Sequence, residues 1–296
     1  MSLDPSAGPG RPTLAGRPVA TDRALVMAIV NRTPDSFYDR GATFSDDAAK
    51  ARVDAVVADG ADLVDVGGVK AGPGDPVDAA AEVQRVVPLI AWIRSHHPDL
   101  LISVDTWRSE VAKAACEAGA DIINDTWAGV DPALVDVAAQ AGAGIVCSHT
   151  GGARVRTRPH RVAYDDVVAD VIAEVTGAAT RAREAGVRDD GILIDPTHDF
   201  GKNTHHGLAL LREIDRLVDT GWPVLMALSN KDFIGETLGV GLEERVAGTL
   251  AATALAASRG ARVFRVHEVA HTRRVVDMVA SIAGSRPPSR AVRGLA

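Results

Sequence analysis

Short runs of aliphatic and β-branched residues alternate along this chain with longer Ala-rich segments in which apolar positions recur at helical spacing. Such runs are typical of buried parallel strands, and the segments between them are typical of helices that cover a sheet. The predicted strands are Leu25–Val30, Leu63–Val66, Leu100–Val104, Ile122–Asn124, Gly144–Cys147, Gly191–Ile194, Pro223–Leu228 and Arg262–Val266. A helix is predicted after each strand, including Asp46–Ala58 and Ala79–Arg94, with Ser45 and Asp46 as cap residues of the first one.

The strands and helices form one uninterrupted series, because no stretch rich in Pro and Gly separates them. We therefore expect a single domain over residues 18–283, flanked by disordered tails at residues 1–17 and 284–296. Eight strand–helix units in one domain favour a closed (β/α)8 TIM barrel of the α/β class over an open doubly wound sheet.

A polar side chain stands at the end of almost every predicted strand. These residues are Asn31, Asp65, Asp105, Asn124, His149, Asp195, Ser229 and His267. In a TIM barrel the carboxyl ends of the strands open at one mouth, where the active sites of this fold lie. Any single one of these residues can instead cap the following helix. The series as a whole favours a common polar site.

Composition and charge narrow the range of partners. The 296 residues carry a net charge of -7, so no basic surplus attracts nucleic acid or an anionic membrane surface. The N-terminus lacks the apolar core of a signal peptide, and no apolar stretch approaches the roughly 20 residues that a membrane span needs. We therefore expect a cytoplasmic protein. Cys116 and Cys147 lack metal-ligand spacing, so we expect buried thiols and no zinc site.

The loop after the first predicted strand reads Asn31-Arg32-Thr33-Pro34-Asp35-Ser36-Phe37 and resembles the NxTPDSF motif of dihydropteroate synthases. That family joins a dihydropterin diphosphate to p-aminobenzoate and releases diphosphate. Further matching segments follow in the same order, namely Asp65-Val66-Gly67-Gly68, Ser103-Val104-Asp105-Thr106, Ile122-Ile123-Asn124-Asp125, Asp195-Pro196, Phe200-Gly201-Lys202, Ser229 with Lys231, Phe233-Ile234-Gly235 and Arg265-Val266-His267. The resemblance is collinear from about Val26 to Ala270.

The chemistry of a pterin ring explains two of these residues. Its amino-pyrimidinone edge presents N–H donors beside an acceptor, so a buried Asp can accept from it while an Asn amide supplies the complementary pattern. Asp195 and Asn124 fit these two roles. The resemblance implies further pterin contacts for Asp105, Phe200 and Lys231, although an aromatic residue such as Phe200 suits core packing equally well.

The resemblance also implies roles in the transfer reaction. The implied catalytic residues are Asp105, Lys231, Arg265 and His267, with Asp105 placed to stabilise positive charge as the diphosphate leaves. The implied diphosphate ligands are Asn31, Arg265 and His267, and Asn31 is also the implied ligand of Mg2+. Thr33, Pro34 and Ser229 are implied to lie on the p-aminobenzoate side.

A homodimer is implied as well, through helices late in the barrel. The Ala-rich run Gly248–Ala257 suits close packing of two subunits, although packing within the barrel explains the run equally well. The expected partners of the chain are therefore a second copy, a pterin-like small molecule and p-aminobenzoate analogues.

The loops around the implied site depart from the family pattern. Lys70-Ala71-Gly72 replaces a Ser-Thr-Arg triplet that contacts the diphosphate and the incoming amine. Single replacements occur at Arg32 (a small apolar residue in the family), at Thr197 and Asp199 (two glycines), at Asn230 (an Arg) and at Glu268 (an Asp). The lost glycines lead us to expect a different backbone path in that loop. Lys202 is expected at the surface or at a helix cap.

Matched residues beneath altered loops indicate a divergent, inactive paralogue with a partly retained pterin pocket and little or no dihydropteroate synthase activity. The competing hypothesis is an active dihydropteroate synthase in which Arg32, Lys70 or Arg40 compensates for the lost groups. The sequence also leaves open a binding or regulatory protein without chemistry, a pterin-binding methyltransferase, and a transferase for a different small molecule. The TPDSF loop and the Phe-Ile-Gly stretch argue against the methyltransferase.

Overall fold

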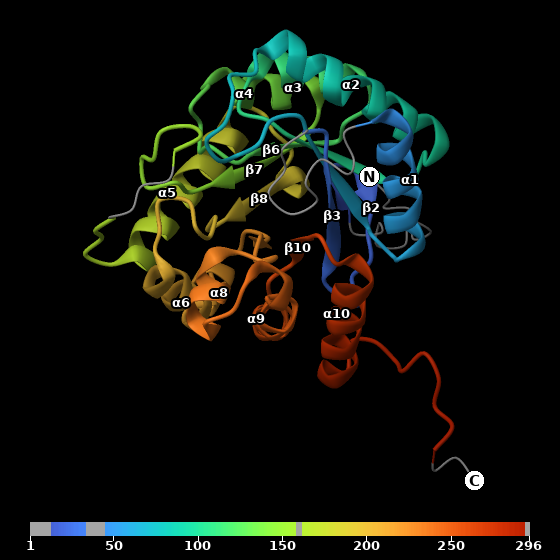
Figure 1. Cartoon of the computed structure of the whole chain (residues 1–296), viewed down its shortest axis with the longest axis vertical. Coiled ribbons are helices and arrows are strands. Elements are labelled where there is room, and N and C mark those ends of the chain that lie inside the picture. The colour runs from blue at the N-terminus through green and yellow to red at the C-terminus, as the bar shows by residue number, and fades with distance from the viewer. Residues whose placement is uncertain (1–12, 34–44, 158–161, 294–296) are drawn as a thin grey trace, which may run out of the picture.

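Eight parallel strands form a barrel with helices around it in the computed structural model, which describes residues 13–33, 45–157 and 162–293 (Figure 1). Around the barrel the strands follow the order β8-β7-β6-β5-β4-β3-β10-β9. Their bounds are β3 Leu25–Asn31, β4 Leu63–Gly67, β5 Leu101–Asp105, β6 Ile122–Asp125, β7 Gly144–Ser148, β8 Ile192–Asp195, β9 Leu225–Met226 and β10 Val263–Val266. A parallel bridge between Ile194 and Val224 brings the two ends of this series together. The predicted TIM barrel is confirmed, and every observed barrel strand overlaps its predicted run.

The register of the strands sets the polar residues at one level. Asn31 of β3 is paired with Gly67 of β4. Asp105 of β5 is paired with Gly67 on one side and with Asn124 of β6 on the other. A Cβ atom at Gly67 would lie 3.5 Å from Asn31 Oδ1 and 3.6 Å from Asp105 Cβ. Because Gly67 has no side chain, Asn31 and Asp105 border the same space.

The helices cover the outside of the barrel. Their bounds are α1 Asp46–Ala58, α2 Ala79–His96, α3 Ser109–Glu117, α4 Ala133–Ala141, α5 Val167–Glu184, α6 Thr204–Arg212, α7 Ile214–Val218, α8 Asp232–Leu238, α9 Val246–Ser258 and α10 Val269–Ala283. Helix α1 begins after Ser45, as predicted, and the Ser45 hydroxyl accepts a hydrogen bond from the Ala48 amide at 3.4 Å. Within the described ranges, every helix is too short or too polar to pass through a membrane.

A separate apolar core fills the inside of the barrel. It consists of Leu25, Met27, Leu63, Leu101, Ile122, Val146, Leu193, Leu225, Ala227 and Val263, and Leu14 joins it. Leu14 belongs to a short hairpin formed by β1 (Thr13–Leu14) and β2 (Arg17–Pro18), and Arg17 pairs with Asp121 before β6. The hairpin therefore packs on the amino-terminal end of the barrel. Residues 13–17 of the predicted tail therefore belong to this hairpin.

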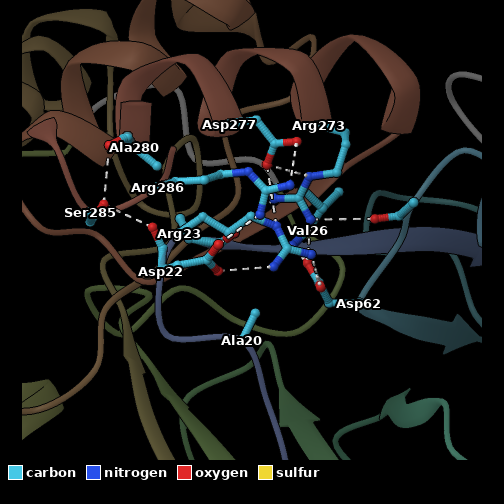
Figure 2. Close-up of polar contacts among 12 residues, drawn as sticks. Ala20, Asp22, Arg23, Val26, Asp62, Arg273, Asp277, Ala280, Ser285 and Arg286 are labelled. Atoms are coloured by element: carbon cyan, nitrogen blue, oxygen red, sulfur yellow. Dashed lines mark hydrogen bonds and ion pairs between the residues drawn. The ribbon is translucent and has the colours of Figure 1, made fainter. Parts of the chain in front are cut away.

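The segment after α10 is bonded to residues just before β3, the first barrel strand (Figure 2). Helix α10 is followed by Gly284, and Arg286 then pairs with Asp22 at 2.7 Å. The Ser285 hydroxyl donates to the Asp22 carbonyl at 2.8 Å. Residues 284–293 contain no helix or strand. The division of the chain into one domain and two tails stays a prediction.

Asp62 forms a charged cluster with Arg23 and Arg273, which share its carboxylate (Figure 2). Its carboxylate accepts from Arg23 at 2.9 Å, from Arg273 at 2.7 Å and from the Val26 amide at 2.8 Å. The Asp62 side chain is only 14% exposed, so these bonds form largely away from water. The cluster joins the start of β3 to α10, the last helix of the barrel.

We expect Asp62→Asn to lower the free energy of unfolding by about 2 kcal/mol, because a largely shielded carboxylate shared by two guanidinium groups becomes a neutral amide. Chemical denaturation measures the change. Asp59→Asn is the matched control, since Asp59 is exposed at the end of α1. Equal free energies for the two variants would show that the cluster does not stabilise the fold.

Candidate functional site

A cavity of about 430 Å³ lies at the carboxyl ends of the barrel strands. The predicted site residues that line it are Asn31, Thr33, Asp105, Asn124, Asp195, Phe200, Ser229, Lys231, Arg265 and His267. Pro34 lies outside the described residues. The structure therefore brings all the described candidates to one cavity, as the strand-end pattern indicates. Their individual roles toward a ligand stay predictions.

The floor of the cavity is organised around Asp65, a fully buried carboxylate on β4. Its Oδ1 accepts from the Ser103 hydroxyl at 2.6 Å. Its Oδ2 accepts from Arg265 Nε at 2.6 Å and from Asn124 Nδ2 at 3.1 Å. A buried charge needs such partners, and in return it fixes their orientation. Because Asn124 donates to Asp65, its amide oxygen is left as an acceptor for a ligand.

Arg265 joins Asp65 to Asp105. Its Nη2 donates to Asp105 Oδ2 at 2.8 Å, while the Thr126 hydroxyl donates to Asp105 Oδ1 at 2.8 Å. Burial raises the pKa of Asp105, the Arg265 guanidinium opposes this shift, and the Asp65 carboxylate adds to it. The charge of Asp105 at the cavity therefore depends on Arg265.

Asp195 and Lys231 line another part of the cavity wall. Asp195 Oδ1 accepts from the Thr197 amide at 2.7 Å, which leaves Oδ2 for a ligand. Burial raises the pKa of Asp195, and Lys231 opposes that shift. Burial lowers the pKa of Lys231 against the pull of nearby carboxylates. The Lys231 ammonium donates to the His198 carbonyl and lies 5.2 Å from the centre of the Phe200 ring.

Phe200 both packs in the protein and lines the cavity. Its ring centre lies 5.1 Å from that of Trp127, edge to face. Trp127 is 2% exposed and lines the same cavity. The two interpretations of Phe200 that the sequence leaves open, core packing and a ligand contact, are thus compatible with one position.

Lys202 is buried, so the expectation of a surface or cap residue is wrong. Its ammonium donates to the carbonyl oxygens of His149 at 2.9 Å, Phe200 at 2.9 Å and Thr197 at 3.2 Å. Burial lowers the pKa of Lys202 to about 7, and Lys231 acts in the same direction. Lys202 ties the loop after β7 to the loop after β8, which carries Phe200.

The Ser229 hydroxyl is enclosed by polar neighbours. It lies 3.0 Å from His267 Nδ1 and 3.2 Å from Glu268 Oε2, and it accepts from the His267 amide at 3.2 Å. Burial lowers the pKa of His267 to about 3, with Arg265 and Arg52 acting in the same direction. His267 is therefore a neutral hydrogen-bonding group at physiological pH and brings no charge to an anionic ligand.

Two of the sequence departures contact each other. Asn230 Nδ2 donates to Glu268 Oε1 at 2.9 Å, and Asn230 Oδ1 accepts from the Thr249 hydroxyl at 3.3 Å. Asn230 is fully buried and does not belong to the cavity lining. The residue that replaces the family Arg is thus turned into the protein and bonded to the residue that replaces the family Asp.

Thr197 and Asp199, which stand where the family pattern has glycines, both have backbone conformations that glycine adopts freely. The expected difference in backbone path of this loop stays a prediction. Thr197 has a φ of 50° and Asp199 a φ of 69°, in the left-handed region that glycine adopts freely. Side-chain bonds offset the strain. The Thr197 hydroxyl accepts from the His149 amide at 3.2 Å and donates to the Asp195 carbonyl at 3.0 Å. Asp199 Oδ2 accepts from the Asp232 amide at 2.6 Å.

The rim of the cavity lacks the groups of the family triplet. Lys70, Ala71 and Gly72 line it. Arg32, by contrast, does not belong to the lining: its Nε donates to the Arg85 carbonyl at 3.1 Å, and its Nη2 pairs with Asp46 on α1. The hypothesis of an active enzyme relies on Arg32, Lys70 or Arg40. Of these, Lys70 lines the cavity, Arg32 does not, and Arg40 lies outside the described residues.

His149 contacts α5 and does not line the cavity. Its Nε2 lies 2.8 Å from Asp170 Oδ1 and 3.3 Å from Glu174 Oε2. The nitrogen and oxygen atoms that these three side chains could offer to a metal ion lie within 4.8 Å of one another. Among the described residues, this is the group with such spacing. Burial lowers the pKa of His149 to about 4, and a neutral imidazole that donates to Asp170 accounts for the arrangement.

Sequence reasoning assigns no site role to Lys202 or Trp127 and includes Asp65 only in the series of polar strand ends, although all three shape the cavity. Asp65 and Lys202 lie within motifs that match the family, so the motifs themselves carry the signal. Nothing in the sequence around Trp127 distinguishes it from a core residue.

Comparison with known proteins agrees with this geometry. Residues 27–267 match the family model described as pterin binding enzyme. A Mycobacterium leprae (strain TN) protein named inactive dihydropteroate synthase 2 is 70% identical over 287 residues, which cover 96% of this chain and 99% of the relative. The Yersinia pestis dihydropteroate synthase in a sulfonamide drug complex superposes with a TM-score of 0.86 at 32% identity, covering 93% of this chain and 99% of that one. The Xanthomonas albilineans dihydropteroate synthase in complex with 7,8-dihydropteroate gives a TM-score of 0.79 at 40% identity, covering 91% and 97%. As the sequence resemblance predicts, this chain belongs to the pterin-binding enzyme family, as a dihydropteroate synthase-like protein.

Proposed function

We propose that this protein binds a pterin-like ligand in the barrel cavity and has little or no dihydropteroate synthase activity. The observation that carries the proposal is the contrast between the floor and the rim of the cavity. Asp105, Asn124 and Asp195 are retained on the floor. Ala71 and Gly72 line the rim where the family has Thr and Arg.

The floor supplies a polar pattern that suits a pterin edge. The Asn124 amide is oriented by Asp65 and keeps its oxygen for a ligand donor, while Asp195 keeps Oδ2 as a second acceptor. Phe200 and Lys231 add an aromatic face and an ammonium. The 7,8-dihydropteroate complex of the Xanthomonas albilineans relative supports a ligand of this class.

The rim is short of groups that stabilise charge during the transfer reaction. One well-placed donor of this kind commonly contributes about 3 kcal/mol to transition-state stabilisation. The triplet has two hydroxyls and a guanidinium, and loss of the guanidinium with even one hydroxyl corresponds to about 10^4-fold in rate. Lys70 supplies one positive charge without the two-pronged geometry of Arg. An active enzyme would need Lys70 to replace both groups.

Magnesium enters this proposal as a partner of a bound diphosphate. Mg2+ keeps several waters and binds phosphate oxygens, so it needs few protein ligands. Asn31 offers one amide oxygen at the cavity wall, and Arg265 and His267 line the same cavity. The residues present therefore fit a magnesium–diphosphate pair, in which Asn31 would hold the ion and Arg265 would neutralise the phosphate oxygens.

We expect Asp195→Asn to weaken the binding of dihydropterin diphosphate by about 10- to 100-fold, because an amide N–H would face ligand donors where a carboxylate accepts from them. Isothermal titration calorimetry with Mg2+ present measures the affinity. Asp59→Asn, on the outside of the barrel, should bind like the unaltered protein. Absence of binding to the unaltered protein, or equal affinity for Asp195→Asn, would contradict a pterin site.

We expect the value of kcat/KM for diphosphate release, with p-aminobenzoate as the second substrate, to be at least about 1,000-fold below that of the Xanthomonas albilineans enzyme. Restoring the triplet with Lys70→Ser, Ala71→Thr and Gly72→Arg together should raise the rate at least tenfold. A coupled assay that follows diphosphate measures both. Turnover close to that of the ordinary enzyme would instead support an active dihydropteroate synthase.

We also propose a cytoplasmic homodimer that binds no nucleic acid, in keeping with the net charge of -7. Met278 and Ile282 are 61% and 74% exposed and lie one turn apart on α10. Leu255 is 40% exposed on α9, which packs against α10. Large apolar side chains exposed on two adjacent helices are typical of an interaction surface.

The double variant Met278→Glu with Ile282→Glu should be monomeric, because two buried carboxylates would oppose association at this surface. Sedimentation velocity measures the oligomeric state. Val292→Glu is the control, since Val292 is 62% exposed in the C-terminal segment, away from α9 and α10 in the sequence. An unchanged dimer in the double variant would place the interface elsewhere.

A further inference from the structure

A guanidinium group contacts the backbone of the segment from which the triplet Arg is absent. Gly72 stands at the position of the triplet Arg. Its carbonyl oxygen accepts a hydrogen bond from Arg156 Nε at 3.2 Å, and the Asp75 carbonyl accepts from Arg156 Nη1 at 2.8 Å. Arg156 belongs to the loop after β7, 84 residues along the chain from Gly72. A different loop therefore supplies a positive charge to this part of the rim.

A second cavity, of about 360 Å³, adjoins this contact. It is lined by Pro73, Gly74, Pro76, Val77, Arg108 and Arg156. The segment after β4 borders both cavities, because residues 69–72 line the main cavity and residues from 73 to 77 line the second. The second cavity thus lies on the mouth side of the barrel but does not share its lining with the pterin floor.

The two arginines of this cavity are held in place by other bonds. Arg108 pairs with the buried Glu82, donates to the Val77 carbonyl at 2.7 Å, and lies 4.6 Å from the centre of the Trp107 ring. Arg156 bonds two neutral carbonyl oxygens, and no carboxylate of the described ranges pairs with it. Its Nη2 group remains for a ligand, and a guanidinium that is already oriented loses little conformational entropy when it binds one.

We propose that this second cavity binds an oxyanion, a phosphate or a carboxylate group, between Arg156 and Arg108. The chemistry follows from the fork of N–H donors on each guanidinium, which matches the oxygen atoms of both kinds of anion. The Glu82 carboxylate offsets the charge of Arg108, so Arg156 provides the net positive charge of the site. The site is separate from the place of a diphosphate at Asn31, Arg265 and His267, and it does not require a pterin in the main cavity.

Trp107 gives a local signal for a test, because its ring stacks with Arg108. Inorganic diphosphate in one arm and glutarate in the other are titrated into the protein, and tryptophan emission is compared with that of Trp107→Phe. The emission that depends on Trp107 should change on binding. Arg156→Ala should weaken this binding at least about tenfold, since a charge-assisted donor is lost. Response in a single arm identifies whether phosphate or carboxylate is preferred.

Arg154→Ala is the matched control, because Arg154 is exposed on the same loop and makes no side-chain bond within the described ranges. It removes the same charge and should change the affinity less than twofold. Arg156→Lys keeps the positive charge but lacks the fork of N–H donors, so it should bind the anion more weakly than the unaltered protein. This variant tests the role of the fork independently of any change that Arg156→Ala causes in the loop. Equal affinities for Arg156→Ala and Arg154→Ala, or no Trp107-dependent signal with either anion, would overturn the proposal. Asp195→Asn should leave this signal unchanged, so failure of the pterin proposal is distinguishable from failure of this one.

Discussion

The guanidinium group of Arg265 is the interaction on which the cavity floor depends. It reaches from β10 to Asp65 on β4 and Asp105 on β5, two carboxylates that would otherwise repel each other in a site of low polarity. Asp65 in turn holds Asn124. The floor is therefore one connected unit, in which the acceptor pattern offered to a ligand is set by contacts that the ligand itself does not touch.

This connection explains why the floor and the rim can change independently. The floor residues lie on strands whose register is fixed by the barrel, and each of them is bonded to another. The rim residues Lys70, Ala71 and Gly72 belong to a loop, where substitutions leave the barrel hydrogen bonds intact. The replacements at Lys70, Ala71 and Gly72 thus fall on the rim and leave the connected floor residues unchanged.

The sequence predicts the barrel because each buried strand is a continuous apolar run and a polar residue stands at the end of each strand. Both features can be recognised without knowledge of contacts. It does not show which way a long side chain turns. Arg32 and Lys202 illustrate the limit: Arg32 extends between α1 and α2, and Lys202 turns inward onto three carbonyl oxygens. The hairpin at residues 13–18 also escapes prediction, because two-residue strands carry no periodicity.

Several residues of the altered loops form hydrogen bonds that join these loops to the barrel and to each other. Asn230 bonds Glu268, Thr197 bridges β7 and β8 despite its left-handed backbone, and Arg156 bonds the carbonyl of Gly72. The altered loops are therefore joined to each other, with Arg156 of the loop after β7 bonded to the loop after β4. Since Arg156 lines the second cavity and not the main one, its positive charge does not take the place of the triplet Arg beside a ligand in the main cavity.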